Sequence, residues 1–161
     1  MFEHPSGPGA VPPMLASAIA PLRILTVPWG IAGGWALDLV MGRVTRAHHD
    51  VDVAIFRADQ AAIRVALAGW EFDAVLDGKR RPWPAGTWLA LPTHEIHAVP
   101  PIRDTAGLEF LLNERDGADW VFRRNPEVRR PVPQALVRTP AGLLVLAPEI
   151  VLLYKAKAPR A

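Results

Sequence analysis

The sequence contains no cysteine among its 161 residues. Disulfide bonds, thiolate metal sites and a catalytic cysteine are therefore excluded, and nothing in the sequence requires an oxidising compartment. Long apolar runs are lacking too. The charge-free stretch at residues 24–37 is interrupted by a proline and three glycines, and it falls short of the roughly 18 apolar residues of a membrane-spanning helix. The N-terminal residues lack the basic and apolar regions of a secretory signal, so we expect a cytoplasmic protein.

An excess of charge of one sign is also missing. The sequence has 18 Lys and Arg residues against 16 Asp and Glu residues, a formal net charge of +2, and this small margin does not indicate a nucleic-acid partner. Hydrophobic residues make up 50% of the chain, enough for a packed core. We expect the Pro- and Gly-rich residues 1–13 to form a flexible arm and residues 14–161 to form a single domain.

Helical and strand patterns alternate along the chain. Helices are predicted at residues 14–22, 35–41 and 59–67 and from Pro148 onward, with Asp59 as the N-cap of the third. Strands are predicted at residues 29–32, 51–56, 71–76, 88–91, 96–99, 108–112 and 120–123. The basic segments at 79–81 and 123–124 are predicted to be solvated turns. This order predicts an α+β fold with a mixed or antiparallel sheet flanked by helices.

A glycine pair, Gly33 and Gly34, separates a predicted strand from a predicted helix. Paired glycines let the backbone approach another group closely, and the free N–H groups of a helix N-terminus favour an anion such as phosphate. On its own the pair is more typical of a structural turn.

Three acidic residues are candidates for a metal site. Asp50 and Asp52 stand two residues apart at the start of a predicted strand, so their side chains point to the same face. The two carboxylates repel each other unless a cation, typically divalent, lies between them. A solvated strand end is the equally supported alternative. Glu109, a lone acid in an apolar segment, either points to solvent or joins the aspartates from a neighbouring strand.

Together these features resemble the nucleotidyltransferase superfamily with the DNA polymerase beta-like catalytic core. Residues 29–53 are most similar to the aminoglycoside and lincosamide nucleotidyltransferases. The residues that match their pattern are Gly33, Gly34, Trp35, Asp38, Gly42, Arg43, Thr45, Arg46, His48, Asp50 and Asp52. Segments 109–114, 120–124 and 146–157 resemble the same branch more loosely.

The resemblance implies an Mg²⁺-dependent enzyme of antibiotic resistance that transfers NMP from an NTP, with ATP expected, to a hydroxyl of a small molecule such as an aminoglycoside or lincosamide. It implies Asp50, Asp52 and Glu109 as catalytic metal ligands, with Glu109 alternatively the general base. The nucleotide-binding residues that we expect are Gly33, Gly34, Arg46, Lys155 and Lys157.

The C-terminal segment suggests a homodimer. The relatives usually continue beyond the segment that contains Lys155 and Lys157 into a further helix or helical domain. We also expect the apolar face formed by Ile150, Val151, Leu153 and Tyr154 to be larger than one domain can cover. A second subunit would supply the missing wall and bring Lys155 or Lys157 near the phosphates.

Two other functions stay open. A basic surface formed by Arg123, Arg124, Arg129 and Arg130 would favour a toxin-like enzyme that adds nucleotides to tRNA or protein. A Glu109 far from the aspartates would favour a non-catalytic nucleotide-binding module of the same fold.

Several histidines are ambiguous from the sequence alone. His94 and His97, on either side of Glu95, are candidates for an acceptor pocket or for exposed strand positions. A zinc site at His48 and His49 is disfavoured because the chain lacks cysteine and regular ligand spacing. Asp38 is expected to orient Arg46 or its loop by hydrogen bonding.

Overall fold

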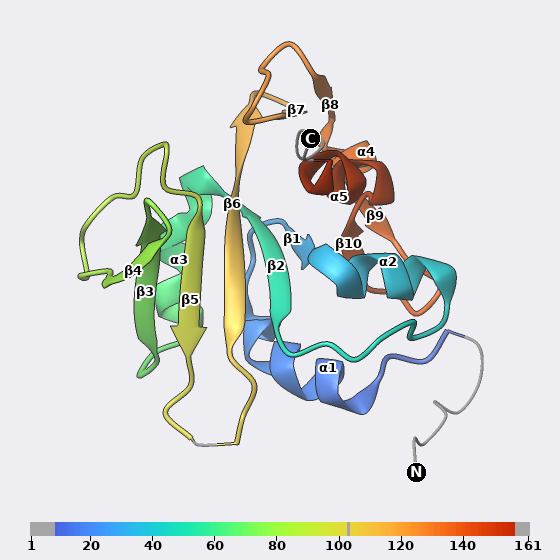
Figure 1. Ribbon diagram of the computed structural model, residues 1–161, viewed down its shortest axis with the longest axis horizontal. Helices are drawn as coiled ribbons and strands as arrows, with labels where there is room; N and C mark the ends of the chain where they lie inside the picture. The colour runs from blue at the N-terminus through green and yellow to red at the C-terminus, as the bar shows by residue number, and fades with distance from the viewer. Residues whose placement is uncertain (1–8, 103, 157–161) are drawn as a thin grey trace, which may run out of the picture.

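The computed structural model describes residues 9–102 and 104–156 (Figure 1). The helices are α1 (Pro13–Ile19), α2 (Gly33–Met41), α3 (Gln60–Ala66), α4 (Val132–Ala135) and α5 (Pro148–Lys155), with 3-10 turns η1 (Ala20–Ile24) and η2 (Arg57–Asp59). The strands are β1 (Trp29–Ile31), β2 (Val51–Phe56), β3 (Glu71–Leu76), β4 (Lys79–Pro82), β5 (Glu95–Val99), β6 (Leu108–Asp116), β7 (Asp119–Val121), β8 (Arg129–Pro131), β9 (Leu136–Arg138) and β10 (Leu144–Leu146). Among the described residues, no helix combines the length and the apolar character needed to span a membrane.

In the part of the chain that the structure describes, ten strands form one mixed sheet. Eight of them lie in the order β4-β3-β5-β6-β2-β1-β10-β9. Strand β7 pairs with the C-terminal end of β6, and β8 pairs with β7. The β2–β6 and β1–β10 pairs are parallel and the other pairs are antiparallel. The predicted α+β class with a mixed sheet is therefore confirmed.

The two faces of the central strands differ in polarity because apolar and polar residues alternate along them. Val53, Ile96 and Phe110 are fully buried and face the core, to which Ile63 of α3 also belongs. In Figure 1, α3 lies behind β3 and β5. Asp52, Glu95 and Glu109, each next to one of these strands' buried residues, therefore lie on the opposite face.

The glycines at the two ends of α2 set its length. Gly33 and Gly42 both have positive φ, 60° and 69°, a region that glycine enters without a steric cost. The N–H of Gly42 donates to the carbonyl of Asp38 and ends the helix. The predicted helix is confirmed, although it begins at Gly33, two residues earlier than expected.

Two local predictions are wrong. Residues 88–91 form a loop instead of a strand, since the side chains of Gln60 and Arg57 bind the backbone of Leu89 at 2.8 Å each. Residues 79–82 form β4 at the sheet edge, where charged side chains reach solvent. Asp59 is the N-cap residue of α3 as predicted, although its side chain makes no cap hydrogen bond.

The apolar face of α5 is covered within the chain. Helix α5 begins at Pro148 as predicted and contacts α2. Ile150 and Val151 are buried, Leu153 and Tyr154 pack against the core, and Leu152 is exposed. The expectation that one domain leaves this face uncovered is therefore wrong.

The predicted N-terminal arm lies partly outside the described residues, which begin at Gly9. Within the described part, Val11 is half-buried against the core.

Candidate active site

Two carboxyl side chains lie next to each other on neighbouring strands. The parallel register of β2 and β6 pairs Asp52 with Glu109, and paired residues present their side chains on one face of the sheet. The two carboxyls are within hydrogen-bonding contact. The Glu109 side chain is 23% exposed, and Asp52 is half-buried. The structure thus brings two of the predicted site residues together.

Burial raises the pKa of both carboxyls. For Glu109, the hydrogen bond to Asp52 and the negative charges of Asp52, Asp50 and Glu95 add to the effect of burial and raise the pKa to about 8. For Asp52, burial raises the pKa, whereas the hydrogen bond to Glu109 and the positive charge of Lys155 lower it. The net effect is a pKa above the ordinary value. Crowded carboxyls of this kind are stabilised by a cation.

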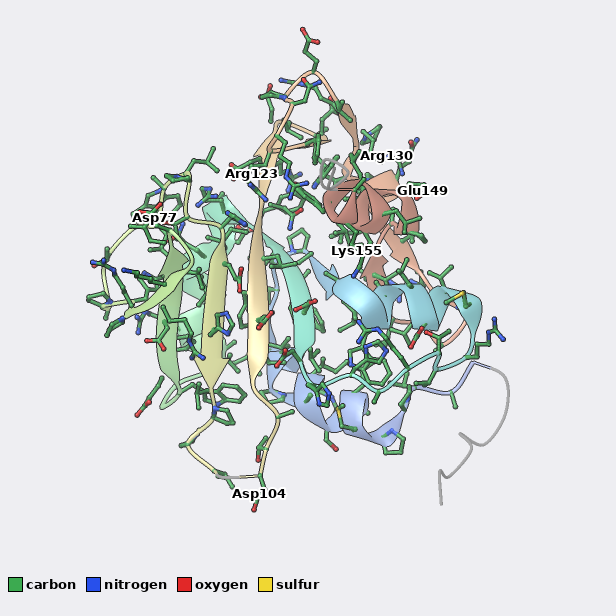
Figure 2. The ribbon with its side chains drawn as sticks, viewed as in Figure 1. Asp77, Asp104, Arg123, Arg130, Glu149 and Lys155 are labelled. Carbon is green, nitrogen blue, oxygen red and sulfur yellow. The ribbon has the colours of Figure 1, made fainter. Side chains whose placement is uncertain are left out.

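Asp50 and Lys155 flank this pair. Asp50 is exposed immediately before β2, and its charge raises the pKa of both Asp52 and Glu109. Lys155, at the C-terminal end of α5, lowers the pKa of Asp52 and lies between α5 and α2 in Figure 2. Lys155 of the same chain is therefore close enough to Asp52 to affect its pKa, and the homodimer stays a prediction. Lys157 lies outside the described residues.

Gly33 lies against the Asp52 carboxyl. A Cβ atom on Gly33 would overlap Oδ2 of Asp52 and would lie 2.9 Å from its Cγ. The N–H of Ala32 also donates to the Asp52 carbonyl at 2.8 Å. The turn between β1 and α2 is therefore fixed directly beside the acidic pair.

Gly34 lies against the loop that joins α2 to β2. A Cβ atom on Gly34 would lie 2.5 Å from Nη2 of Arg46 and 2.7 Å from Cε1 of His48. The guanidinium of Arg46 thus lies next to the start of α2, where backbone N–H groups have no partner within the helix. A guanidinium and a helix N-terminus side by side are suited to bind an anion.

Asp38 holds this loop in place. Its carboxylate accepts hydrogen bonds from the N–H and the hydroxyl of Thr45, at 3.1 and 2.6 Å, and contacts Nε2 of His48 at 2.6 Å. Burial alone would raise the pKa of Asp38, but the hydrogen bonds from His48 and Thr45 outweigh it and lower the pKa. The His48 ring also packs on Trp35, with ring centroids 4.3 Å apart. Asp38 orients the loop as expected, through Thr45 and His48.

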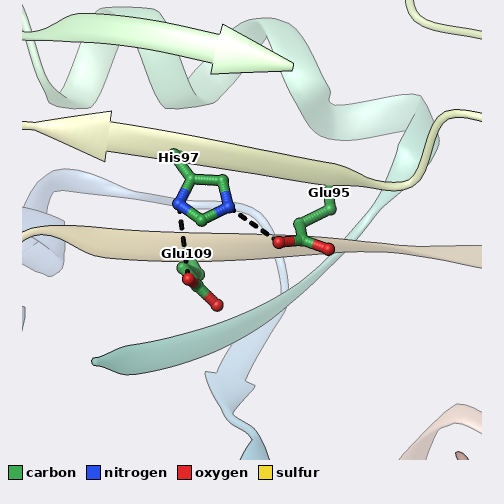
Figure 3. A group of neighbouring side chains, drawn as sticks. All are labelled: Glu95, His97 and Glu109. Atoms are coloured by element: carbon green, nitrogen blue, oxygen red, sulfur yellow. Dashed lines mark hydrogen bonds and ion pairs between the residues drawn. The ribbon is translucent and has the colours of Figure 1, made fainter. Parts of the chain in front are cut away.

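His97 and Glu95 extend the acidic row onto β5 (Figure 3). The antiparallel register of β5 and β6 places His97 opposite Glu109. Nδ1 of His97 lies 3.3 Å from Oε1 of Glu109, and Nε2 lies 2.7 Å from Oε1 of Glu95. From the sequence these residues are only candidates for an acceptor pocket or exposed positions. The Glu-x-His alternation within a strand is the signal that points to this face.

Within the described residues, Glu95, His97 and Glu109 form the one group of three His or acidic side chains close enough to share a metal ion. Nε2 of His48 instead contacts the Asp38 carboxylate. The zinc site at His48 and His49, already disfavoured by the sequence, gains no support.

Comparison with known proteins identifies relatives of this architecture. The family model for aminoglycoside-2''-adenylyltransferase matches residues 14–125. The lincomycin-bound structure of the lincosamide antibiotic adenylyltransferase LnuA has a TM-score of 0.62 and 14% sequence identity, over 95% of this chain and 90% of that chain. No curated protein matches the sequence significantly.

Two structures of ANT(2'')-Ia share the fold as well. The complex with adenylyl-2''-tobramycin has a TM-score of 0.53 and 17% identity, over 83% of this chain and 66% of that chain. The solution structure has a TM-score of 0.57 and 16% identity, over 91% of this chain and 72% of that chain. The segment that the family model matches contains the glycine pair, both aspartates and Glu109. The resemblance predicted from the sequence is confirmed: this chain belongs to the aminoglycoside-2''-adenylyltransferase family and is a nucleotidyltransferase.

Proposed function

We propose that this protein transfers AMP from ATP to a hydroxyl group of a small antibiotic of the aminoglycoside or lincosamide class, in a Mg²⁺-dependent reaction. The observation that carries the proposal is the contact of Asp52 and Glu109 beside the Gly33 turn. In the reaction, the acceptor oxygen forms a bond to the α-phosphorus of ATP while the bond to the pyrophosphate oxygen breaks. The hydroxyl proton passes to a base, and pyrophosphate leaves.

Asp52 and Glu109, which lie side by side, would hold the Mg²⁺ ion together with Asp50. Within the described residues Asp50 does not yet lie close enough to share an ion with both of them, so its side chain would have to move toward the pair when the ion binds. Carboxylate oxygens are the ligands that Mg²⁺ prefers. Burial first, and then the neighbouring negative charges, raise the pKa values of Asp52 and Glu109, so a cation would stabilise their ionised forms. A bound Mg²⁺ ion stabilises negative charge on the attacking and leaving oxygens of a phosphoryl transfer.

Glu109 has two candidate roles, that of a third metal ligand and that of the general base. The pKa of about 8 favours the base, because a catalytic base works best with a pKa near the operating pH. If Glu109 is the base, Glu109→Gln lowers kcat about 10²- to 10⁴-fold and leaves the affinity for Mg²⁺·ATP unchanged. If Glu109 is a ligand, both kcat and the affinity for Mg²⁺·ATP fall.

The triphosphate would bind at the N-terminus of α2. Gly33 and Gly34 let the start of α2 lie directly against Asp52 and the Arg46 guanidinium, and the positive charge of Lys155 is close enough to lower the pKa of Asp52. These groups supply the positive charge that the triphosphate needs. The role of Lys157 stays a prediction.

A small acceptor fits the surface charges better than a nucleic acid does. Arg129 pairs with Asp116 at 2.7 Å, and Arg130 lies 3.5 Å from Glu149. The basic surface that an RNA acceptor requires is therefore partly neutralised. The acceptor class follows the structural neighbours, of which one is bound to lincomycin and one is in complex with adenylyl-2''-tobramycin. The contact between Glu109 and Asp52 also argues against a non-catalytic binding module.

Thermal unfolding with ATP, GTP, CTP or UTP, each with and without Mg²⁺, tests nucleotide binding. A ligand at 100 times its Kd stabilises the folded state by about 2.7 kcal/mol. We expect ATP with Mg²⁺ to raise the Tm by several degrees, and Asp52→Asn to remove the Mg²⁺-dependent part. A null result with all four nucleotides would contradict the proposal. Light scattering of the same samples tests the predicted homodimer.

A further inference from the structure

His97 contacts two carboxyl groups through two different ring nitrogens. Nε2 lies 2.7 Å from Glu95 and Nδ1 lies 3.3 Å from Glu109. The side chains of Glu95, His97 and Glu109 are 31%, 20% and 23% exposed, so all three are sheltered while the row remains accessible. A histidine ring in this position connects the two carboxyls and fixes the distance between them.

The backbone holds this arrangement from three strands. Glu95 and His97 stand two residues apart on β5 and share a face. His97 is paired with Glu109 of β6, which is paired in turn with Asp52 of β2. All three strands have a neighbour on each side within the sheet. Glu109 is therefore flanked by Asp52 on one side and His97 on the other.

The same three side chains bring ligand atoms within 4.8 Å of one another, a spacing that a metal ion could also use. A metal ion binds one ring nitrogen, and the other ligands must then converge on the same side of the ring. In Figure 3 the two carboxyls lie at different nitrogens of His97. The contacts therefore favour a chain of polar contacts over a metal centre.

We propose that Glu95 and His97 are positioning residues: Glu95 fixes the His97 ring, and the ring keeps the Glu109 carboxyl beside Asp52. The proposal rests on the proposed function, in which Glu109 removes the proton of the acceptor hydroxyl. Asp52 and Glu109 repel each other when both are ionised, and a glutamate side chain has rotatable bonds that let it turn away. The contact with His97 opposes that movement.

Loss of this contact should reduce kcat because a general base must be held in a defined position. A general base acts only within hydrogen-bonding reach of its proton and contributes roughly 10²- to 10⁴-fold to the rate, and a misplacement of about 1 Å costs about 10²-fold. Loss of the His97 contact with Glu109 is therefore expected to reduce kcat strongly and to leave the binding of ATP almost unchanged.

Two substitutions of His97 separate its two contacts. Asparagine carries its amide atoms at the position of Nδ1, so His97→Asn keeps a partner for Glu109. Glutamine reaches the position of Nε2, so His97→Gln keeps a partner for Glu95 alone. We expect kcat for AMP transfer to fall about 3- to 10-fold in His97→Asn and about 100-fold in His97→Gln, with the KM for ATP within about twofold of the wild type in both.

Asp73→Asn is the matched control. Asp73 of β3 is the register partner of His97 on its other side, but it pairs with Arg80 at 3.0 Å. Its substitution removes a carboxylate from the same row without touching the contact with Glu109, so kcat should stay within about twofold. Equal losses in His97→Asn and His97→Gln, or an equal loss in Asp73→Asn, would overturn the proposal.

A double substitution tests whether His97 acts through Glu109. In a Glu109→Gln background, His97→Gln should cause no further loss, because the group that it positions is already gone. A multiplicative loss would show an independent role and would refute the positioning role.

Crystal structures of the two His97 variants give a readout that needs no activity. Glu109 should turn away from Asp52 in His97→Gln and stay beside it in His97→Asn. If the wild-type protein transfers AMP to no acceptor, the proposed function fails, and these structures still decide the positioning role. A Glu109 side chain unmoved in His97→Gln would refute it.

Discussion

The substitution Gly33→Ala should damage the site in a measurable way. Gly33 has φ of 60°, and a Cβ atom there would overlap the Asp52 carboxyl. Gly42, at the other end of α2, has a similar φ of 69°, but nothing lies within 4 Å of the point that a Cβ atom would occupy there. Gly42→Ala therefore reproduces the backbone strain of Gly33→Ala without the clash.

The expected magnitudes follow from these two terms. A left-handed conformation costs an alanine about 1–2 kcal/mol, so Gly42→Ala should lower the Tm by roughly 2–8 °C for a domain of this size. Overpacking adds about 1–3 kcal/mol. Gly33→Ala should therefore lose roughly 2–5 kcal/mol. Because the clash falls on Asp52, it should also lose most of its AMP transfer, whereas Gly42→Ala should stay close to wild-type activity.

Thermal unfolding and a single-turnover transfer assay on both variants check this prediction. The informative quantity is the difference between the variants, because the strain of positive φ cancels. If Gly33→Ala matched Gly42→Ala in both Tm and transfer rate, the close packing of the β1–α2 turn against Asp52 would not matter for stability or catalysis, and the reasoning would be wrong.

Three further predictions concern charged residues. The pKa of Glu109 rises from 4.5 to about 8 in the folded state. The stabilisation of the metal-free protein by protonated Glu109 should therefore be fully present below pH 4.5 and be lost as the pH rises toward 8. Glu109→Gln should flatten this profile of Tm against pH. Asp38→Ala removes the partner of Thr45 and His48 and should cost about 1–3 kcal/mol in denaturant unfolding, with weaker ATP binding because the Arg46 loop is released. Arg46→Ala and Lys155→Ala, both at exposed positions, should raise the KM for ATP several-fold and leave the Tm unchanged.

Local signals in the sequence predict much of the fold near the site. The β-branched run at residues 51–56 forms β2 with the predicted bounds, Gly42 ends α2, and Pro148 begins α5. Each of these features depends on residues that are neighbours in the chain. The Asp50-x-Asp52 spacing and the glycine pair are local in the same sense.

Features that depend on contacts between distant parts of the chain could not be predicted from the sequence. The contact of Glu95 and His97 with Glu109 requires the register of β5 against β6, which no local pattern specifies. The strands β4 and β8 consist of charged and proline residues at edge positions and lack the apolar alternation that predicts a strand. The burial of the apolar face of α5 depends on packing against α2 and could not be derived from the helix alone.

The most direct test of the central claim is mass spectrometry of acceptors incubated with the protein, ATP and Mg²⁺. A panel of aminoglycosides and lincosamides should contain at least one compound that gains a single AMP group, with pyrophosphate released in equal amount. Asp52→Asn, which keeps the shape of the side chain and removes its charge, should give no product. Unmodified acceptors throughout the panel, or transfer by Asp52→Asn at the wild-type rate, would contradict the account.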